Sequence, residues 1–470
     1  MLTAEDLSSM TMVDGATDKK TVLVGLGKTG LSCARYLVRR GEPFVVVDTR
    51  NDPPGFKELL SIAPNVDCYL GTLEPFVFSN AEKVIVSPGV SVKEPAIAGA
   101  QQQGADIIGD IALFAQQADA PIIAITGSNG KSTVTTMVEA MAQQSQLNVK
   151  VGGNLGVPAL DLLDDAEYAG QESPAFYVLE LSSFQLETTP DLHAHAAVVL
   201  NVSADHMDRY TSLQEYIGAK QKIFHNCQHK VVNRDDPAVA AMITADDLQS
   251  SDVVSFGLSK PPTANDFGVE YDNGNAWLVK GTERLMLAQD IFLPGRHNQA
   301  NALAALALGE TMGLAMDDML AVLRHFAGLP HRMQLVATRN TVAWYNDSKG
   351  TNVGATVSAI AGMPGNKILI AGGDGKGADF DPLREAVIAN NVRLVILIGK
   401  DADRIASALA GVVQVEKATN MYAAVALADK RVKPNEKVIL SPACASFDMF
   451  NDYQHRGEVF MEAVRSLSSS

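Results

Sequence analysis

Cysteine is scarce in this chain of 470 residues. It occurs four times, at Cys33, Cys68, Cys227 and Cys444, and never in CxxC spacing. A disulfide scaffold and a cysteine-rich zinc site are therefore not expected, and a reducing compartment such as the cytoplasm fits the composition.

Positive charge is also in short supply. The sequence has 38 Lys and Arg against 54 Asp and Glu, which gives a formal net charge of −16. A protein that binds a nucleic-acid polymer needs a basic surface, so we expect no such partner. A small phosphorylated ligand is still allowed, because backbone N–H groups can hold it.

Long apolar runs are absent as well. The longest stretches, such as Asn301–Gly309 and Leu394–Gly399, are far shorter than the roughly 20 residues that span a bilayer. The first residues carry acids and no apolar core, so we expect neither a signal peptide nor membrane association. With 47% hydrophobic and 20% charged residues, the chain is predicted to be a globular cytoplasmic protein.

Short β-branched apolar runs alternate with helical patterns along the chain, which is typical of parallel α/β sheets. Expected helices include Leu31–Arg40, Ser132–Gln144 and Gln299–Gly313, and hairpins are expected around Pro261-Pro262 and Asn273-Gly274. The expected strands are Thr21–Gly25, Phe44–Asp48, Lys83–Ser87, Asp106–Ile108, Pro121–Thr126, Phe176–Glu180, Ala196–Asn201, Thr341–Tyr345, Lys367–Ala371, Arg393–Gly399 and Lys437–Ser441.

These patterns predict an α/β protein of three domains, in line with about 150 residues per domain. A Rossmann-like domain would span residues 1–109, a central domain of the phosphate-loop ATPase type 110–328, and a Rossmann-like C-terminal domain 329–470. Disorder is expected at residues 1–19 and in the tail Ser468–Ser470.

A phosphate-binding loop is the strongest signal. Thr126–Thr133 reads TGSNGKST and lies between an expected strand and an expected helix. Backbone N–H groups of such a loop form an anion cradle, the Lys131 ammonium can reach the terminal phosphates, and the Ser132 hydroxyl can bind Mg²⁺. The general motif has glycine where this chain has Ile125. The alternative is a tight turn with a solvated lysine.

Glu180 ends an expected strand and can hold a metal beside this loop. Acids at strand ends are common, however, so this observation alone favours an ordinary surface acid.

A second glycine motif points elsewhere. Gly25–Gly30 reads GLGKTG after a strand, and Asp48 ends the next strand, which is the form of a dinucleotide-binding fingerprint. An NAD-dependent oxidoreductase is thus one alternative, and a nucleotide-binding regulatory module without chemistry is another. UDP would fit the same fingerprint, because it also carries a diphosphate and a ribose. An enzyme that transfers hydride does not need the triphosphate site that Thr126–Thr133 predicts.

Eight segments, in order along nearly the whole chain, resemble the Mur ligase family of cytoplasmic peptidoglycan amide ligases. They are TGSNGKST, LELSSFQLE (Leu179–Glu187), NVSADHMDRY (Asn201–Tyr210), GRHNQAN (Gly295–Asn301), GLPHR (Gly328–Arg332), NDSKGTN (Asn346–Asn352), GGDGKGADF (Gly372–Phe380) and SPACASFD (Ser441–Asp448). The family shares the missing first glycine of the loop.

The resemblance implies an ATP-dependent ligase that joins D-glutamate to UDP-N-acetylmuramoyl-L-alanine through an acyl phosphate. It implies small-molecule substrates, two magnesium ions and a monomer. A folylpolyglutamate synthetase would start near its phosphate loop, whereas 125 residues precede the loop here. The DNPR-type motif of the diaminopimelate-adding member is not found.

The resemblance also assigns site residues. Catalytic roles fall on Lys131, His206 and Lys220. ATP contacts fall on Gly127, Ser128, Asn129, Gly130, Lys131, Ser132, Thr133, Asn298, Asn301, Arg332 and Asp347, with His297 nearby. Contacts to the UDP-linked substrate fall on Leu26, Thr29, Asp48, Thr49, Arg50, Ser87, Gly89, Asn154 and His206. Contacts to the amino acid fall on Lys349, Thr351, Lys376, Ser446, Phe447 and Tyr453. Metal ligands are Ser132, Glu180, His206 and Lys220.

Four of these assignments have simpler readings from the residues alone. Lysine ammonium repels Mg²⁺, so Lys220 would act as a ligand only after carbamylation by CO₂, and on pattern alone it is an exposed helix lysine. His206 alone indicates a packed or surface imidazole. Asn298 precedes an Ala/Leu run and is also a candidate helix cap. Lys376 alone indicates a solvated lysine.

Overall fold

The computed structural model describes residues 20–168, 173–244, 247 and 252–467. They fall into two compact units, Met1–Gln116 with Thr188–Pro190 and Gln117–Glu187 with Asp191–Ser470. The disorder expected at residues 1–19 and 468–470 lies outside the described residues. Among the helices that are described, none is long and apolar enough to cross a bilayer.

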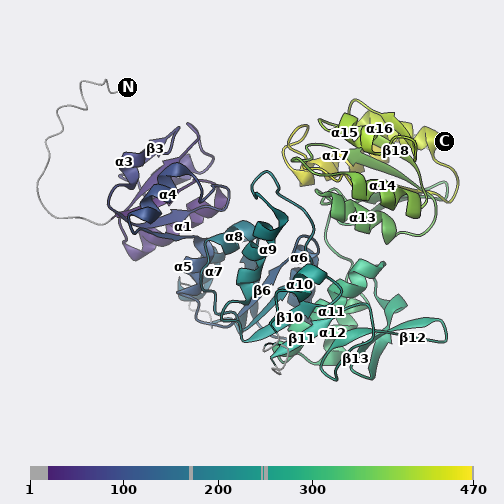
Figure 1. Cartoon of the computed structure of the whole chain (residues 1–470), viewed down its shortest axis with the longest axis horizontal. Helices are drawn as coiled ribbons and strands as arrows, with labels where there is room; N and C mark the ends of the chain where they lie inside the picture. The colour runs from purple at the N-terminus through teal and green to yellow at the C-terminus, as the bar shows by residue number, and fades with distance from the viewer. Residues whose placement is uncertain (1–19, 169–172, 245–246, 248–251, 468–470) are drawn as a thin grey trace, which may run out of the picture. The chain divides into compact units, whose positions relative to one another are not determined.

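The first unit is built on one parallel sheet of five strands in the order β3-β2-β1-β4-β5 (Figure 1). Val22, Leu23 and Val24 of the central strand are all fully buried, so both faces of the sheet are covered. Its elements are β1 (Lys20–Val24), α1 (Lys28–Arg40), β2 (Phe44–Asp48), α2 (Phe56–Ile62), β3 (Cys68–Leu70), α3 (Pro75–Phe78), β4 (Ala81–Val86), α4 (Pro95–Gln102), β5 (Asp106–Ile108) and α5 (Asp110–Ala115).

The second unit contains two sheets, and the first of them has nine described strands in the order β14-β13-β12-β11-β10-β9-β6-β8-β7. The strands from β12 to β7 run parallel, and β12, β13 and β14 form antiparallel hairpins. Its elements are β6 (Ile122–Thr126), α6 (Lys131–Gln144), β7 (Val149–Gly153), α7 (Ala159–Tyr168), β8 (Phe176–Glu180), α8 (Ser183–Glu187), β9 (Ala196–Val199), α9 (Leu213–Gln221), β10 (His229–Asn233), α10 (Pro237–Ala240), β11 (Val253–Phe256), β12 (Phe267–Asp272), β13 (Asn275–Lys280), β14 (Glu283–Leu287), α11 (Arg296–Thr311) and α12 (Met316–Leu323).

The other sheet of this unit has six strands in the order β15-β16-β20-β17-β18-β19, all parallel except β15. Alternate residues of β17 enter two different cores: Ile368 and Ile370 on one face, Leu369 and Ala371 on the other. Its elements are β15 (Gln334–Arg339), β16 (Val342–Asn346), α13 (Val353–Ala361), β17 (Lys367–Gly372), α14 (Asp381–Ala389), β18 (Val392–Ile398), α15 (Ala402–Ala408), β19 (Gln414–Lys417), α16 (Met421–Arg431), β20 (Lys437–Leu440) and α17 (Tyr453–Ser466).

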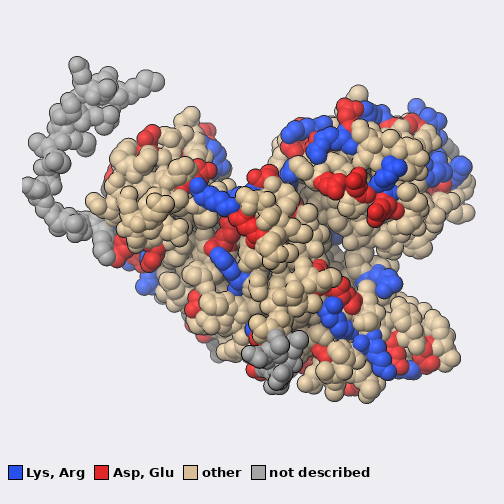
Figure 2. Space-filling view, in the orientation of Figure 1, with Lys and Arg blue, Asp and Glu red and all other residues tan. Residues whose placement is uncertain are grey.

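The α/β class and the hairpin expected at Asn273-Gly274 are confirmed. Both turn residues have positive φ, 48° and 80°, as a two-residue hairpin turn requires. The hairpin expected around Pro261-Pro262 is wrong, because the flanking strands β11 and β12 pair in parallel and need a longer connection. On the face shown in Figure 2, Lys and Arg side chains are interspersed with Asp and Glu. The domain boundaries at 109 and 328 stay predictions.

Candidate active site

The loop between β6 and α6 has a backbone that only glycine allows at two points. Gly127 has a φ of 154° and Gly130 a φ of 86°. A Cβ added at Gly130 would lie 2.5 Å from Asn301 Oδ1. The loop therefore runs against α11 with no room for a side chain, and its N–H groups precede the start of a 14-residue helix.

Side chains that follow β9 hold the loop in this shape. Asn201 Oδ1 accepts the Asn129 N–H at 2.8 Å, and Asn201 Nδ2 donates to the Asn129 carbonyl at 3.0 Å. The Ser128 hydroxyl donates to the Ser203 carbonyl at 2.9 Å. The loop is thus preorganised by the protein itself.

Two lysines converge on the same loop carbonyl. Lys131 Nζ and Lys220 Nζ donate to the Gly127 oxygen at 2.8 Å and 2.9 Å. Lys220 is fully buried, contrary to its reading as an exposed lysine. Burial lowers the pKa of both ammonium groups, and the Lys131 charge lowers the pKa of Lys220 further, well below its usual value.

Glu180, at the end of β8, supplies a carboxylate beside these cations. Its Oε1 accepts a hydrogen bond from Asn154 Nδ2 at 2.7 Å. Its Oε2 is buried and has no hydrogen-bond partner among the described residues. A buried carboxylate oxygen is costly to leave alone, so it is a natural ligand for a cation.

Ser132, the hydroxyl that a phosphate loop offers to Mg²⁺, accepts a hydrogen bond from the Arg332 guanidinium at 3.1 Å. No group of three or more His, Cys, Asp or Glu side chains is placed to hold a metal within the described part of the chain. The residues present therefore fit a metal held jointly by a serine hydroxyl, Glu180 and phosphate oxygens better than one held by protein carboxylates alone.

His206 lies in a strained turn and against an aromatic ring. Its φ is 57°, its ring packs edge-on to Phe184 at 4.8 Å, and its Nε2 is 3.7 Å from Asp205 Oδ2. Burial lowers the pKa of His206, which favours the neutral, metal-binding imidazole. His206 lies near Lys131, whose charge also lowers that pKa.

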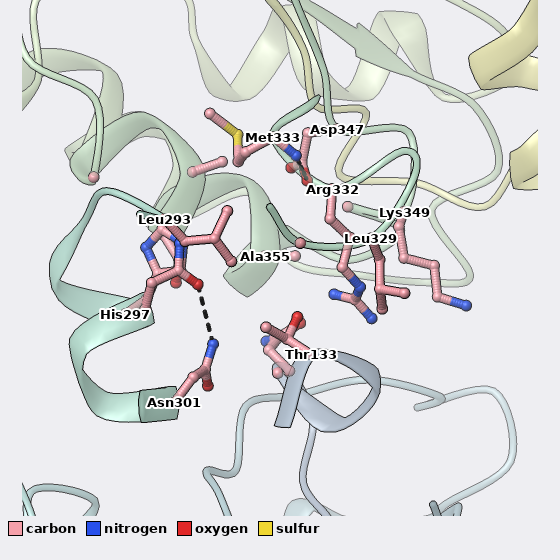
Figure 3. A pocket seen from close by; sticks show the side chains of 18 of the residues that line it. Thr133, Leu293, His297, Asn301, Leu329, Arg332, Met333, Asp347, Lys349 and Ala355 are labelled. Carbon is pink, nitrogen blue, oxygen red and sulfur yellow. Dashed lines mark hydrogen bonds between the residues drawn. The ribbon is translucent and has the colours of Figure 1, made fainter. Parts of the chain in front are cut away.

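A cavity of about 820 Å³ opens beside the loop (Figure 3). Figure 3 shows the Arg332 side chain reaching toward the start of α6, with His297 and Asn301 on the opposite wall. Asn298, Asn301, Arg332 and Asp347 all line this cavity, as does the phosphate loop through Asn129, Gly130 and Thr133.

The reading of Asn298 as a helix cap is wrong. The helix α11 begins at Arg296 with Gly295 as its N-cap, because glycine takes the φ of 106° found there. Asn298 instead lies in the first turn, where its Nδ2 donates to the Pro294 carbonyl at 2.9 Å and its Oδ1 accepts a bond from Asn301.

Asp347 is a buried acid with two hydrogen-bond donors. Ser441 Oγ donates to it at 2.7 Å and the Met333 N–H at 3.2 Å. Burial outweighs these bonds and the nearby Arg332 charge, and it raises the pKa of Asp347 to about 6.

The residues assigned to the amino acid are only partly gathered. Lys349 Nζ lies 3.9 Å from the centre of the Tyr453 ring. Lys376 Nζ lies 3.8 Å from Asp205 Oδ1, on the His206 side. Ser446 Oγ is buried without a hydrogen-bond partner in the part that is described, whereas Phe447 is 75% exposed.

Two structural supports of the site, Asn201 and Arg456, have no role among the sequence-based assignments. Asn201 fixes the phosphate loop, as described above. Arg456 in α17 is fully buried and donates to the Ser348 carbonyl at 2.7 Å and to the Cys444 carbonyl at 3.0 Å. Their only signal in the sequence is their position within or next to motif segments.

In the first unit, Asp48 is already engaged by the protein. Its Oδ2 accepts the Leu26 N–H at 2.7 Å and the Arg50 guanidinium at 2.6 Å. Burial alone raises the pKa of Asp48, but these hydrogen bonds outweigh it and bring the pKa below its ordinary value. The carboxylate that a dinucleotide-binding fingerprint would offer to a ribose is thus paired with Arg50 within the protein.

The other residues assigned to the UDP-linked substrate lie in both units, most of them in the first. Ser87 Oγ donates to the Gly25 carbonyl at 2.8 Å, which ties the glycine turn to the end of β4. Thr49 and Gly89 are exposed and Thr29 is half-buried. Asn154 belongs to the second unit, where it is bonded to Glu180.

Three family models match this chain: "Mur ligase MurD-like, N-terminal domain" over residues 19–109, "Mur ligase middle domain" over 125–309 and "Mur ligase, glutamate ligase domain" over 331–444. UDP-N-acetylmuramoylalanine–D-glutamate ligases from Marinobacter nauticus and Nitrosococcus oceani are 52% and 49% identical to it. Each match covers 96% of this chain, with 99% and 97% of the relatives. Its fold is similar to that of MurF from Acinetobacter baumannii, with a TM-score of 0.60, 17% identity, and coverage of 95% of this chain and 93% of that one.

Proposed function

Because the chain belongs to the Mur ligase family, an ATP-dependent family that forms amide bonds in peptidoglycan-precursor synthesis, we propose that it joins D-glutamate to UDP-N-acetylmuramoyl-L-alanine. The full-length similarity to relatives that bear this activity in their names supports the choice of substrates. The substrates are small intracellular molecules, so we place the reaction in the cytoplasm, carried out by a single chain.

One observation carries the proposal: a glycine-shaped anion loop lies on the wall of a cavity large enough for a nucleoside. The loop N–H groups and Lys131 would bind the β- and γ-phosphates, and Arg332 would reach the same phosphates from the opposite side. Asn298, Asn301 and Asp347 would contact the adenosine.

The chemistry follows from the weakness of a carboxylate as an electrophile. The terminal carboxylate of the UDP-linked substrate attacks the γ-phosphorus of ATP, the bond to the β-phosphate oxygen breaks, and ADP leaves. The D-glutamate amine then attacks the acyl carbon of the acyl phosphate. Collapse of the tetrahedral intermediate expels phosphate and leaves the amide, with loss of the amine proton. Alignment and charge stabilisation by Lys131 and Arg332 are the contribution of the protein.

Magnesium would be held by Ser132, Glu180, His206 and Lys220 together with phosphate oxygens. Glu180 Oε2, which has no hydrogen-bond partner among the described residues, fits such an ion, as does His206, whose lowered pKa favours the neutral imidazole. When bound, it would neutralise charge on the phosphates.

Lys220 would serve that ion only as a carbamate. Its buried amine has a strongly lowered pKa, so the neutral form that attacks CO₂ is accessible, and loss of one proton leaves an N-carboxylate. The carbamate nitrogen would keep one N–H, which can still donate to the Gly127 carbonyl as Nζ does now.

The amino acid brings two carboxylates, which need cations and hydroxyl donors. Lys376, Lys349 and Thr351 would supply these, and the buried Ser446 hydroxyl, which has no hydrogen-bond partner in the described part of the chain, would supply another. Tyr453 holds Lys349, and Phe447 offers an exposed ring. In the first unit, the Gly25–Gly30 turn and Asp48–Arg50 would bind the UDP portion, with Leu26, Ser87 and Gly89 adjacent.

The test is phosphate release in the presence of ATP, UDP-N-acetylmuramoyl-L-alanine and D-glutamate, compared with L-glutamate and other amino acids. Lys131→Ala should lower turnover by about a thousandfold or more without lowering Tm, because the loop lysine stabilises charge on the transferred phosphoryl group. Lys260→Ala, at an exposed position, is the matched control.

Near-normal turnover in Lys131→Ala would remove the phosphate-loop assignment. NADH absorbance change without phosphate release would favour the oxidoreductase, and nucleotide binding without either would favour a regulatory module.

A further inference from the structure

Asn352, which none of the assignments above includes, uses every polar atom of its side chain to join three segments. Its Oδ1 accepts the Ala355 N–H at 2.8 Å and thereby caps α13. Its Nδ2 donates to Asn129 Oδ1 at 3.3 Å and to Asp205 Oδ2 at 3.0 Å. We call these three side chains, Asn352, Asn129 and Asp205, the Asn352 bridge.

The bridge is buried and tightly packed. Asn352 is 7% exposed. Two residues further on, a Cβ added at Gly354 would lie 2.8 Å from Ser203 Oγ and 3.4 Å from Asn129 Nδ2. The first turn of α13 therefore packs directly against the phosphate loop and the segment after β9. A residue larger than glycine at position 354 would clash with Ser203.

The same segment after β9 also receives Lys376, through the 3.8 Å approach of Nζ to Asp205 Oδ1. Asp205 thus accepts a hydrogen bond from Asn352 and forms an ion pair with Lys376, and both partners follow strands of the six-stranded sheet. Thr351 and Lys376, both candidate contacts of the amino acid, stand next to this junction, while Asn129 belongs to the loop that would bind the triphosphate.

We propose that Asn352 is a positioning residue that holds the amino-acid-binding segments on the phosphate loop, so that the attacking amine meets the acyl phosphate. This inference rests on the proposed ligase function. Asparagine suits the role because a side-chain amide offers one acceptor for the helix cap and two N–H donors, one for the Asn129 amide oxygen and one for the Asp205 carboxylate.

Substitutions at Asn352 can keep the cap of α13 and remove only the hydrogen bonds to Asn129 and Asp205. Asn352→Asp keeps the cap, since a carboxylate accepts the Ala355 N–H at least as well. It replaces the two donated hydrogen bonds by repulsion with Asp205 and Asn129 Oδ1. Asn352→Ser also keeps a cap, but its hydroxyl is too short to reach either partner and adds no charge.

The experiment compares both variants with Asn420→Asp and Asn420→Ser. Asn420 caps α16 through the Ala423 N–H in the same way, at an exposed site away from the cavity. Steady-state kinetics with each of the three substrates and a Tm measurement are made on the full-length chain. We expect both Asn352 variants to raise the KM for D-glutamate about tenfold and to lower kcat, with the KM for UDP-N-acetylmuramoyl-L-alanine unchanged. Tm should stay near that of the parent for Asn352→Ser and fall for Asn352→Asp, which places a carboxylate against Asp205.

A merely structural role would lower the active fraction, and hence kcat, without moving the KM for D-glutamate. That outcome, or Asn352 variants that match their Asn420 controls, would overturn the inference. Absence of D-glutamate-dependent phosphate release from the unmodified chain would instead reject the proposed function itself.

Discussion

At the scale of single residues, the site is defined by charged groups that burial has moved from their ordinary behaviour. Lys131, Lys220 and Arg332 carry pKa values lowered by burial, and the charge of Glu180 acts on all three, with Asp205 acting on the two lysines as well. Such a cluster of cations costs free energy in the isolated protein, and the triphosphate proposed above would compensate it. From the sequence alone Lys220 is predicted to be an ordinary helix lysine. Its burial results from the tertiary packing of α9, which the neighbouring residues in the sequence do not indicate.

The role proposed for Lys220 can be tested by chemical rescue. Lys220→Ala should lose at least about a hundredfold in turnover, since a charged ligand of the phosphate region is removed. Formate or acetate, which fit the space of the missing carbamate, should restore part of it. Lys222→Ala, two residues further on and exposed, is the control. Full activity of Lys220→Ala without added carboxylate would show that this lysine has no catalytic part.

Asp347 predicts a specific pH dependence of stability. Its pKa is raised from an ordinary 3.8 to about 6 in the folded protein, so the folded state binds more protons than the unfolded state between these values. Stability contributed by this group is therefore present at pH 4 and lost as the pH rises through 6, by about 3 kcal/mol at most.

Asp347→Asn removes this titration while its amide can still accept from Met333 and donate to Ser441. In urea unfolding, the variant should gain stability relative to the parent between pH 4 and pH 7.5. For the control Asp429→Asn, on the exposed face of α16, the difference in unfolding free energy from the parent should not change with pH. A pH-independent difference for Asp347→Asn would contradict the assignment of a raised pKa.

At the scale of elements, the strands were the most predictable part. Buried parallel strands read as continuous apolar runs, and Phe44–Asp48 and Phe176–Glu180 have the bounds that their sequence predicts. Helix starts were less predictable: α1, α6 and α11 begin three, one and three residues before the expected positions, because their first turns contain the polar or glycine residues of binding loops. Those turns are shaped by tertiary contacts that hydrophobic periodicity does not record.

The glycine turn of the first unit allows a matched pair of substitutions. A Cβ at Gly30 would lie 1.8 Å from the Gly25 carbonyl oxygen, whereas a Cβ at Gly27 would meet nothing within 4 Å. Gly30→Ala should therefore destabilise this unit by about 3 kcal/mol, since backbone rather than a flexible side chain must move.

Thermal unfolding followed by circular dichroism, with UDP-N-acetylmuramoyl-L-alanine binding by calorimetry, measures the effect. Gly27→Ala should melt like the parent. Equal melting of the two variants would mean that the turn is not packed as described.

At the scale of the whole molecule, the glycine motif of the first unit suggests a dinucleotide-dependent oxidoreductase, whereas that of the second unit suggests a triphosphate site. Only the residues around each motif in the folded chain distinguish the two functions. The strand after the Gly25–Gly30 motif ends at Asp48, whose carboxylate is bound by Arg50. The loop at Gly127–Gly130 instead lines a cavity large enough for a nucleoside. The class of fold and the phosphate loop followed from sequence pattern. The convergence of Arg332 and Asp347 on that cavity followed only from the family resemblance, which assigned Lys349, another residue of its lining, to the amino acid. Sequence pattern alone could not predict it, because residues some 200 positions apart, such as Ser132 and Arg332, meet only in the folded chain.

The order of bond making is the central claim, and isotope transfer tests it most directly. UDP-N-acetylmuramoyl-L-alanine labelled with ¹⁸O in both oxygens of its terminal carboxylate is turned over with ATP and D-glutamate, and the released phosphate is examined by mass spectrometry. Attack of the carboxylate on the γ-phosphorus predicts one ¹⁸O atom in each phosphate and the other in the amide product. Phosphate free of ¹⁸O, with amide formed at the normal rate, would contradict phosphoryl transfer to the carboxyl group.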